Sequence, residues 1–214
     1  MTAASLFVTP GAAFVLADQA SFHDDGTVLA IGSKVSISNR LHLAMTSAGA
    51  GYHGMRTELH TWLDGFDRQD DVLAGLPDLT SRLLASMIAG TTTAEREANP
   101  IPAFLQFYVA LWSDARDQPE AYIVGTAGGT FGSGYPVGRL AGVSQLVSPP
   151  VDLGGDEFTP AKAGQIVDAQ RRTPDDRGIF RVGGGAELVE VRADGVTRRV
   201  VRKWPDRIGC KINP

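Results

Sequence analysis

The chain has 214 residues, of which 43% are hydrophobic and 21% charged, and its formal net charge is −4. This length and apolar content suffice to bury a sizeable core, and we expect one domain over residues 1–214. A negative net charge argues against a duplex-binding protein, which usually carries a basic face. The single cysteine, Cys210, cannot form an internal disulfide, and no apolar run reaches the length that crosses a bilayer. We therefore expect a cytoplasmic protein without nucleic-acid or membrane partners.

The first fifty residues predict a series of short strands. Apolar runs at Leu6–Val8 and Ala12–Leu16 flank Pro10 and Gly11, and a Pro-Gly pair between two such runs predicts a hairpin. A second turn is predicted at Asp24-Asp25-Gly26. Further short strands are expected at Val28–Ile31, Lys34–Ile37 and Leu41–Thr46.

Residues 51–90 change to a helical period. Apolar residues recur there in steps of three and four and predict a helix with one apolar face, formed by Met55, Leu59, Trp62, Leu63 and Phe66. A second helix is predicted at Asp78–Ala89, with Asp78 as its N-cap and Gly90 just beyond its end.

The rest of the chain returns to strands around one more helix. Thr91–Pro102 contains two prolines and predicts a loop before strands at Phe104–Trp112 and Ala121–Val124. Thr159 and Pro160 predict the start of a helix that ends near Arg172. Asp194 and Gly195 predict a hairpin between strands at Ala186–Arg192 and Val196–Lys203. This order fits two sheets, each covered by helices.

A threonine follows the first methionine. Removal of Met1 would give Thr2 a free α-amine and a hydroxyl in the same residue. A threonine hydroxyl is a poor nucleophile near neutral pH unless a base is adjacent, and an α-amine, with a pKa of about 7.7–8.0, can be that base. Thr2 is therefore a candidate nucleophile.

Asp18 and Lys34 are the candidate partners of Thr2. Asp18 ends one predicted strand and Lys34 begins another. A lysine ammonium beside the threonine hydroxyl would favour the alkoxide, and a carboxylate would keep that lysine charged and oriented. The two residues follow Thr2 by 16 and 32 positions.

These offsets resemble those of the proteasome β-subunits and the bacterial peptidase HslV, where an aspartate and a lysine follow the catalytic threonine at the same distances. The context is also similar, with AMTSAGAG at 44–51 like the small-residue stretch before the family's first helix. The resemblance implies that the Gly49 N–H, next to Ala48, forms an oxyanion hole. It further implies that Ser133, in the GSG at 132–134, supports the threonine amine.

The resemblance implies an α+β fold, a four-layer αββα sandwich of two antiparallel sheets flanked by helices, known as the N-terminal nucleophile (Ntn) hydrolase fold. It implies a threonine-type peptidase that cleaves peptides or unfolded proteins, forms a homo-oligomeric ring and has an unfoldase as a possible partner.

One part of the late sequence departs from that family. VGGGAELVEVRADG at 182–195 resembles the family's S-G-G…D-G hairpin, but Val182 and Ile179 replace a serine and an aspartate that set the protonation of the amine. Asp175 or Asp176 could replace that aspartate. Two alternatives follow, a catalytically inactive scaffold or binding protein and an amidase for a small molecule.

Neither a metal nor a cofactor is expected. The four histidines, His23, His42, His53 and His60, show no tight metal-binding spacing, and His53 and His60 fall on the first predicted helix. The glycine-rich segment at 125–134 lacks the Gly-Lys-Ser/Thr ending of a phosphate-binding loop.

Overall fold

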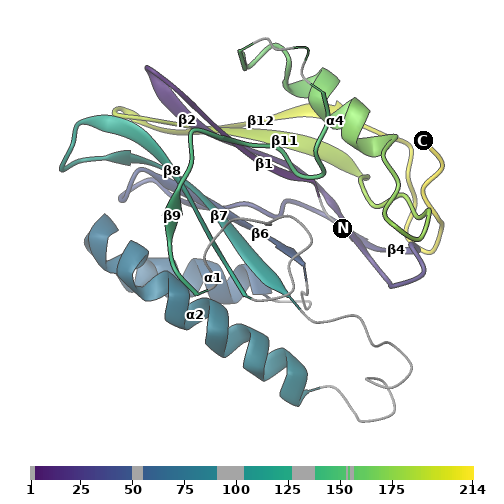
Figure 1. The fold of residues 1–214 in the computed structure, drawn as a ribbon, viewed down its shortest axis with the longest axis horizontal. Helices are drawn as coiled ribbons and strands as arrows, with labels where there is room; N and C mark the ends of the chain where they lie inside the picture. Colours follow the sequence, from purple (N-terminus) through teal and green to yellow (C-terminus); the bar gives the residue numbers. More distant parts are fainter. Residues whose placement is uncertain (1–2, 50–54, 91–103, 127–137, 153, 155–156) are drawn as a thin grey trace.

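The structure, a computed structural model, describes residues 3–49, 55–90, 104–126, 138–152, 154 and 157–214. Two five-stranded sheets face each other, with two helices below one sheet and a third helix above the other (Figure 1). The predicted α+β class and four-layer αββα sandwich are confirmed.

The first sheet has the strand order β10-β1-β2-β11-β12, and every neighbouring pair is antiparallel. The predicted hairpin around Pro10 and Gly11 is present, with Thr9 paired to Ala12 across the turn. The predicted hairpin at Asp194 and Gly195 is also present. The strands are β1 (Ala4–Thr9), β2 (Ala12–Asp18), β10 (Gln145–Leu146), β11 (Gly185–Arg192) and β12 (Gly195–Lys203).

The second sheet has the order β5-β6-β7-β8-β9 and is also antiparallel. Its strands are β5 (Ser36–Ser38), β6 (Leu43–Gly49), β7 (Leu105–Ser113), β8 (Gln118–Gly125) and β9 (Ala141–Gly142). A separate two-stranded ribbon pairs β3 (Ala20–Phe22) with β4 (Val28–Ile31). The sequence did not predict β3, and Lys34 precedes β5 instead of beginning it.

Small side chains fill the space between the two sheets. Half of the buried residues of this cluster are alanines, and these allow the two sheets to approach closely: Ala4, Ala13, Ala17, Ala44, Ala48, Ala110 and Ala121. Both faces of strand β2 are apolar because each face packs in a different part of the core. Ala13, Val15 and Ala17 point toward the second sheet, whereas Phe14 and Leu16 pack toward the outer helix of the first sheet.

Helices α1 (Met55–Asp64) and α2 (Gln69–Ala89) cover the outer face of the second sheet. The predicted start of α2 at Asp78 is wrong by nine residues. The buried side chain of Gln69 bonds to the carbonyls of Leu41 and Trp112 and anchors the helix start to the sheet. The packing of Val72, Leu73 and Leu76 in the same core keeps the chain helical through Pro77.

Helix α2 is 21 residues long and, by length and composition alone, apolar enough to cross a membrane. A single helix of this kind is weak evidence, because core helices of soluble proteins share these properties. Seven of its residues are buried, five of them in the core against the second sheet. We therefore treat α2 as the outer layer of the sandwich.

Helix α4 (Ala163–Arg171) covers the first sheet, where Phe158, Ile166 and Val167 pack on Phe7 and Leu16. The predicted start at Thr159 and Pro160 is wrong, because residues 159–162 form a turn in which the Lys162 N–H bonds to the Thr159 carbonyl. The predicted loop at Thr91–Pro102 and most of the glycine-rich segment lie outside the described residues.

Candidate functional site

The Asp18 carboxylate, at the end of β2, is fully buried and accepts four hydrogen bonds. Its Oδ1 accepts from the Ala3 N–H at 3.1 Å and from Lys34 Nζ at 2.8 Å. Its Oδ2 accepts from the N–H groups of Ala20 and Gly183, both at 3.2 Å. Four donors around one carboxylate satisfy a charge that would otherwise be costly to bury.

Burial and the lysine act on Asp18 in opposite directions. Burial raises the pKa of the Asp18 carboxyl above its ordinary value, while the charge and hydrogen bond of Lys34 and the N–H groups of Gly183 and Ala20 oppose that rise. The Lys34 ammonium is therefore the main support for an ionised Asp18, and the two groups form one electrostatic unit.

Lys34 lies between β4 and β5, and its side chain is 15% exposed. Its backbone contacts both sheets. The Lys34 N–H donates to Glu187 Oε1 of β11 at 3.1 Å, and its carbonyl accepts from Thr46 Oγ1 of β6 at 3.2 Å. The lysine is thus held at the junction of the two sheets, with Nζ directed at Asp18.

Ala3, the first residue that the structure describes, lies against the same carboxylate. Ala3 donates its N–H to Asp18 Oδ1, and the Ala3 carbonyl accepts from the Asp18 N–H at 3.2 Å. Ala3 is buried and is the residue that follows Thr2 in the chain. Thr2 and Ser133 themselves lie outside the described residues, so their predicted roles stay predictions.

Gly49 is the last residue of β6 and has a positive φ of +102°. A Cβ built there would lie 2.3 Å from the Phe104 carbonyl oxygen, so glycine is required by both conformation and space. Ala48 is buried between the sheets. The oxyanion role of the Gly49 N–H stays a prediction.

The two departures from the resemblance fall in a well-connected loop. Val182 is buried, and Ile179 donates its N–H to Asp175 Oδ1 at 2.9 Å. Burial by itself raises the pKa of Asp175, but the N–H of Ile179 and the Arg181 guanidinium outweigh it and hold that pKa below its ordinary value. Arg181 also binds the carbonyls of His23 and Asp24. These contacts assign Asp175 to closing its own loop and give no support to its acting on the Thr2 amine.

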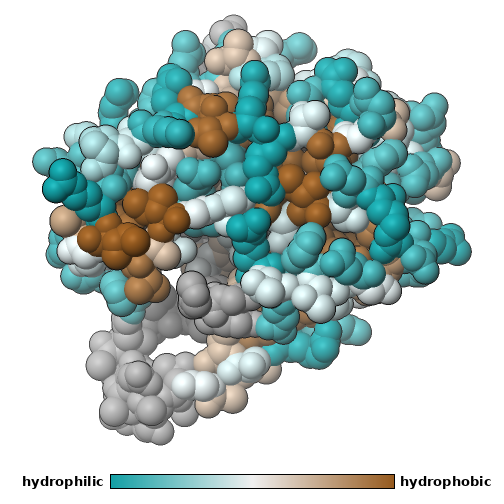
Figure 2. All heavy atoms as spheres, turned by 180° about the vertical axis from the view of Figure 1, so that it is seen from behind, coloured by the Kyte–Doolittle hydropathy of each residue, from teal (hydrophilic) through white to brown (hydrophobic). Residues whose placement is uncertain are grey.

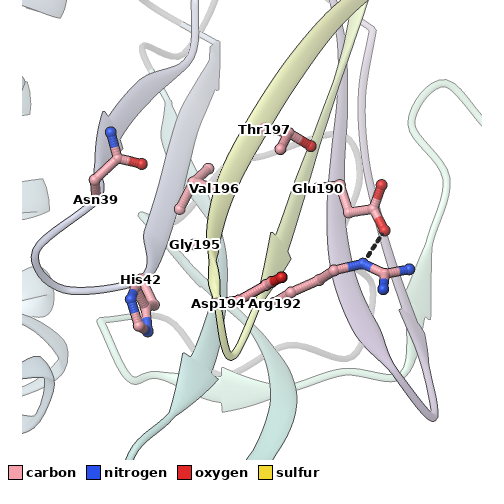
Figure 3. A pocket seen from close by; sticks show the side chains of 8 residues that line it. All are labelled: Asn39, His42, Glu190, Arg192, Asp194, Gly195, Val196 and Thr197. Carbon is pink, nitrogen blue, oxygen red and sulfur yellow. Dashed lines mark hydrogen bonds and ion pairs between the residues drawn. The ribbon is translucent and has the colours of Figure 1, made fainter.

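A hollow of about 450 Å³ lies elsewhere, at the far end of β11 (Figure 3). Glu190 pairs with Phe14 across the strands, whereas Ala186 pairs with Asp18, so several residues of strand separate the hollow from the carboxylate. The walls carry both acidic and basic groups, and Glu190 bonds to Arg192. The lining residues are Asn39, His42, Glu190, Arg192, Asp194, Gly195, Val196 and Thr197.

Across the part of the chain that the structure describes, no group of three or more His, Cys, Asp or Glu side chains could hold a metal ion. His42 and His60 each approach one aspartate, at 3.9 and 3.8 Å, on exposed surface.

Comparison with known proteins supports the architecture. No family model matches the chain, and no curated protein matches it. Among solved structures, the chain is similar to an Anbu (Gly-1) mutant from Hyphomicrobium sp. strain MC1, with a TM-score of 0.60 and 14% sequence identity. The match covers 96% of this chain and 88% of that chain. The chain has an Ntn-like fold.

The narrower family assignment is wrong. The sequence suggested the proteasome β-subunit and HslV family, but no family model matches, and the similar solved structure reported above is an Anbu mutant at 14% identity. The likeness shows the fold alone, and the roles of individual residues rest on the geometry of this structure.

Two features around the candidate site were not predicted. Glu187 is 1% exposed and contacts the Lys34 backbone, and Arg171 with Asp206 holds the glycine turn beside Asp18. Glu187 had a weak sequence signal, as an acidic residue within the predicted strand Ala186–Arg192. The Arg171–Asp206 pair had none, because it joins a helix to a segment 35 positions later in the sequence.

Proposed function

We propose that this chain is a threonine-type Ntn hydrolase that cleaves peptide bonds, with Thr2 as the nucleophile after removal of Met1. The supporting observation is the meeting of Ala3, Asp18 and Lys34. A single peptide bond joins Thr2 to Ala3, and the Ala3 N–H binds the same Asp18 oxygen that accepts from Lys34 Nζ. Ala3, the first residue that the structure describes, is therefore anchored at the lysine–carboxylate pair that the sequence pattern selected.

In this mechanism the Thr2 α-amine takes the proton of the Thr2 hydroxyl as Oγ attacks the carbonyl carbon of the peptide bond. The Lys34 ammonium stabilises the developing negative charge on Oγ, and Asp18 holds that ammonium. The Gly49 N–H stabilises the oxyanion of the tetrahedral intermediate. The amine then gives its proton to the leaving nitrogen, an ester forms on Thr2, and water hydrolyses the ester.

The amine must be neutral to act as a base. Ser133 is the candidate support, whereas Val182 and Ile179 offer no polar side chain where the resemblance expects a serine and an aspartate. A neighbouring ammonium disfavours a second positive charge. Lys34 would therefore favour the neutral amine.

We also propose a peptide or unfolded-protein substrate and association of several copies of the chain. Apolar side chains gather in separate patches among hydrophilic ones on the face in Figure 2, and exposed apolar patches mark interfaces when they are large. Among the described residues, the large exposed apolar side chains are Leu29, Ile31, Ile88, Val200 and Ile208. A closed ring and an unfoldase partner belong to the same proposal, and light scattering of the purified protein tests the association.

An inactive scaffold is the second candidate. The buried Val182 and the Asp175 contacts favour it, because both remove groups that would tune the amine.

Mass spectrometry separates the two candidates. The intact mass shows whether Met1 is removed, and incubation with a threonine-directed epoxyketone or boronate shows whether Thr2 reacts. We expect a mature Thr2 and one adduct per chain, with no adduct on Thr2→Ala. Retained Met1, or a mature chain without an adduct, would favour the scaffold and overturn the proposed mechanism.

A further inference from the structure

Glu187 is a buried carboxylate that the proposed mechanism does not use. It lies on β11 opposite Ala17 of β2, one residue from the Ala186–Asp18 pair. Its Oε1 accepts from Ser33 Oγ at 2.7 Å and from the Lys34 N–H at 3.1 Å. One carboxylate oxygen therefore binds two consecutive residues, and the second of them is the lysine of the candidate site.

Arg198 completes the arrangement from the adjacent strand. Its Nε lies 3.5 Å from Glu187 Oε2, and its Nη2 donates to the Val35 carbonyl at 2.8 Å. Glu187 and Arg198 together contact three consecutive residues, Ser33, Lys34 and Val35. This segment is outside regular secondary structure at Ser33 and Lys34, so side chains supply the hydrogen bonds that strand pairing would otherwise give.

The backbone is irregular at this point of the sheet. Ala186 pairs with Arg202, but Glu187 pairs with Val200, so β12 carries one extra residue here. A bulge of this kind changes the direction of nearby side chains and is often found beside functional sites. An apolar residue at position 187 would avoid the desolvation cost of a carboxylate, and apolar replacements of buried charges are often neutral or stabilising.

We propose that Glu187 is a positioning residue for Lys34. Glu187, assisted by Arg198, fixes the backbone of Ser33–Val35 so that Lys34 Nζ stays 2.8 Å from Asp18 Oδ1. The catalytic consequence rests on the proposed function, but the positioning itself does not require turnover.

The test measures Lys34 directly. Reductive methylation followed by peptide mass spectrometry gives the labelling rate of Lys34 relative to Lys203 and Lys211, which are exposed. Glu187→Ala removes the acceptor, and Glu187→Gln keeps an oxygen for both donors. Glu190→Gln, on the same strand beside the distant hollow, is the matched control.

We expect Lys34 to be labelled several-fold faster, relative to the reference lysines, in Glu187→Ala than in the wild type. In Glu187→Gln and Glu190→Gln the labelling rate of Lys34 should stay within about twofold of the wild-type rate. A factor of two corresponds to less than about 0.5 kcal/mol. An unchanged Lys34 rate in a folded Glu187→Ala would overturn the proposal. If circular dichroism shows that Glu187→Ala has lost its fold, Arg198→Gln decides: selective acceleration at Lys34 in that folded variant supports the proposal, and an unchanged rate overturns it.

A kinetic arm separates this inference from the proposed function. If Thr2 reacts with the epoxyketone, Glu187→Ala should slow that reaction by about tenfold or more, because small displacements of catalytic groups are costly, and Glu187→Gln should restore most of the rate. If Thr2 does not react even in the wild type, the proposed function fails, while the labelling rates still decide whether Glu187 positions Lys34.

Discussion

The Arg171 guanidinium lies 2.7 Å from the Asp206 carboxylate, and both side chains are more than nine-tenths buried. Together they hold a turn of glycines. Arg171 donates to the Val182 carbonyl, and Asp206 accepts from the Gly184 N–H, both at 2.8 Å. The N–H of the residue between them, Gly183, donates to Asp18. A contact between α4 and the C-terminal segment thus fixes one of the four donors of the candidate site.

Breaking this pair should destabilise the protein strongly. We expect Asp206→Ala to lower the free energy of unfolding by about 3–5 kcal/mol, because it leaves a buried guanidinium without its partner. Urea denaturation followed by circular dichroism measures the change. The double variant Arg171→Met/Asp206→Leu should be less destabilised than Asp206→Ala, and Asp67→Asn, in an exposed pair with Arg40, should have almost no effect. Equal stability of Asp206→Ala and the wild type would contradict this account of the turn.

Removal of the lysine charge should make stability depend on pH. In Lys34→Met the Asp18 carboxyl stays buried without its cation, so its pKa, already raised by burial, rises further. A raised folded-state pKa gives stability that is fully present below the ordinary value of 3.8 and is lost as pH rises through the folded pKa. The free energy of unfolding of Lys34→Met should therefore be close to that of the wild type near pH 4 and about 3 kcal/mol lower than that of the wild type at pH 7.

Urea denaturation between pH 4 and pH 8 measures this difference. Addition of Asp18→Asn to Lys34→Met should remove most of the pH dependence, and Lys203→Met, at an exposed lysine, is the control. A difference that is constant over the whole range would show that the Asp18 charge is not responsible.

Glu120 should show the opposite pH dependence. The hydrogen bond from Arg116, together with those from Tyr122 and Gln118, lowers the pKa of Glu120 to about 2 from an ordinary value of 4.5. Its stabilisation is therefore present above pH 4.5 and is lost as pH falls toward 2. Glu120→Gln should be less stable than the wild type at pH 7, by about 1 kcal/mol because Arg116 is half-exposed, and the gap should close in acid. Thermal melts at several pH values measure it, with the exposed Glu157→Gln as the control.

Gly49 should tolerate no side chain, whatever its catalytic role. Gly49→Ala forces a positive φ on alanine and places Cβ against the Phe104 carbonyl. We therefore expect the free energy of unfolding to fall by about 1–3 kcal/mol or more. Gly11→Ala should be close to neutral, because no atom lies within 4 Å of its built Cβ. Chemical denaturation of both variants provides the comparison. A stable Gly49→Ala would mean that the end of β6 can change its conformation.

Short-range patterns predicted most of the fold. The Pro10-Gly11 and Asp194-Gly195 turns gave two hairpins with the correct partners, because turn residues and the flanking apolar runs are both local. The start of α2 could not be read in the same way. It depends on Gln69, whose amide bonds to Leu41 and Trp112, and residues distant in the sequence decide that contact.

The candidate site likewise contains residues that the sequence predicted and residues that it did not. The spacing of Asp18 and Lys34 identified two side chains that do form a buried pair. Their supporting residues, Glu187, Arg171 and Asp206, come from β11, α4 and the C-terminal segment and are brought there only by tertiary packing. Charged residues are normally interpreted as surface residues, so a single sequence gives little reason to expect them in the interior.

Strand β2 lies between β1 and β11 in the first sheet, and all seven of its residues are buried. Asp18 therefore sits on a part of the molecule that local fluctuations do not open, and its amide should exchange with deuterium only when the whole sheet unfolds cooperatively. The Asp18 carboxylate would then stay fixed for as long as the protein is folded, and under the proposed function any adjustment to different substrates would have to come from other parts of the site.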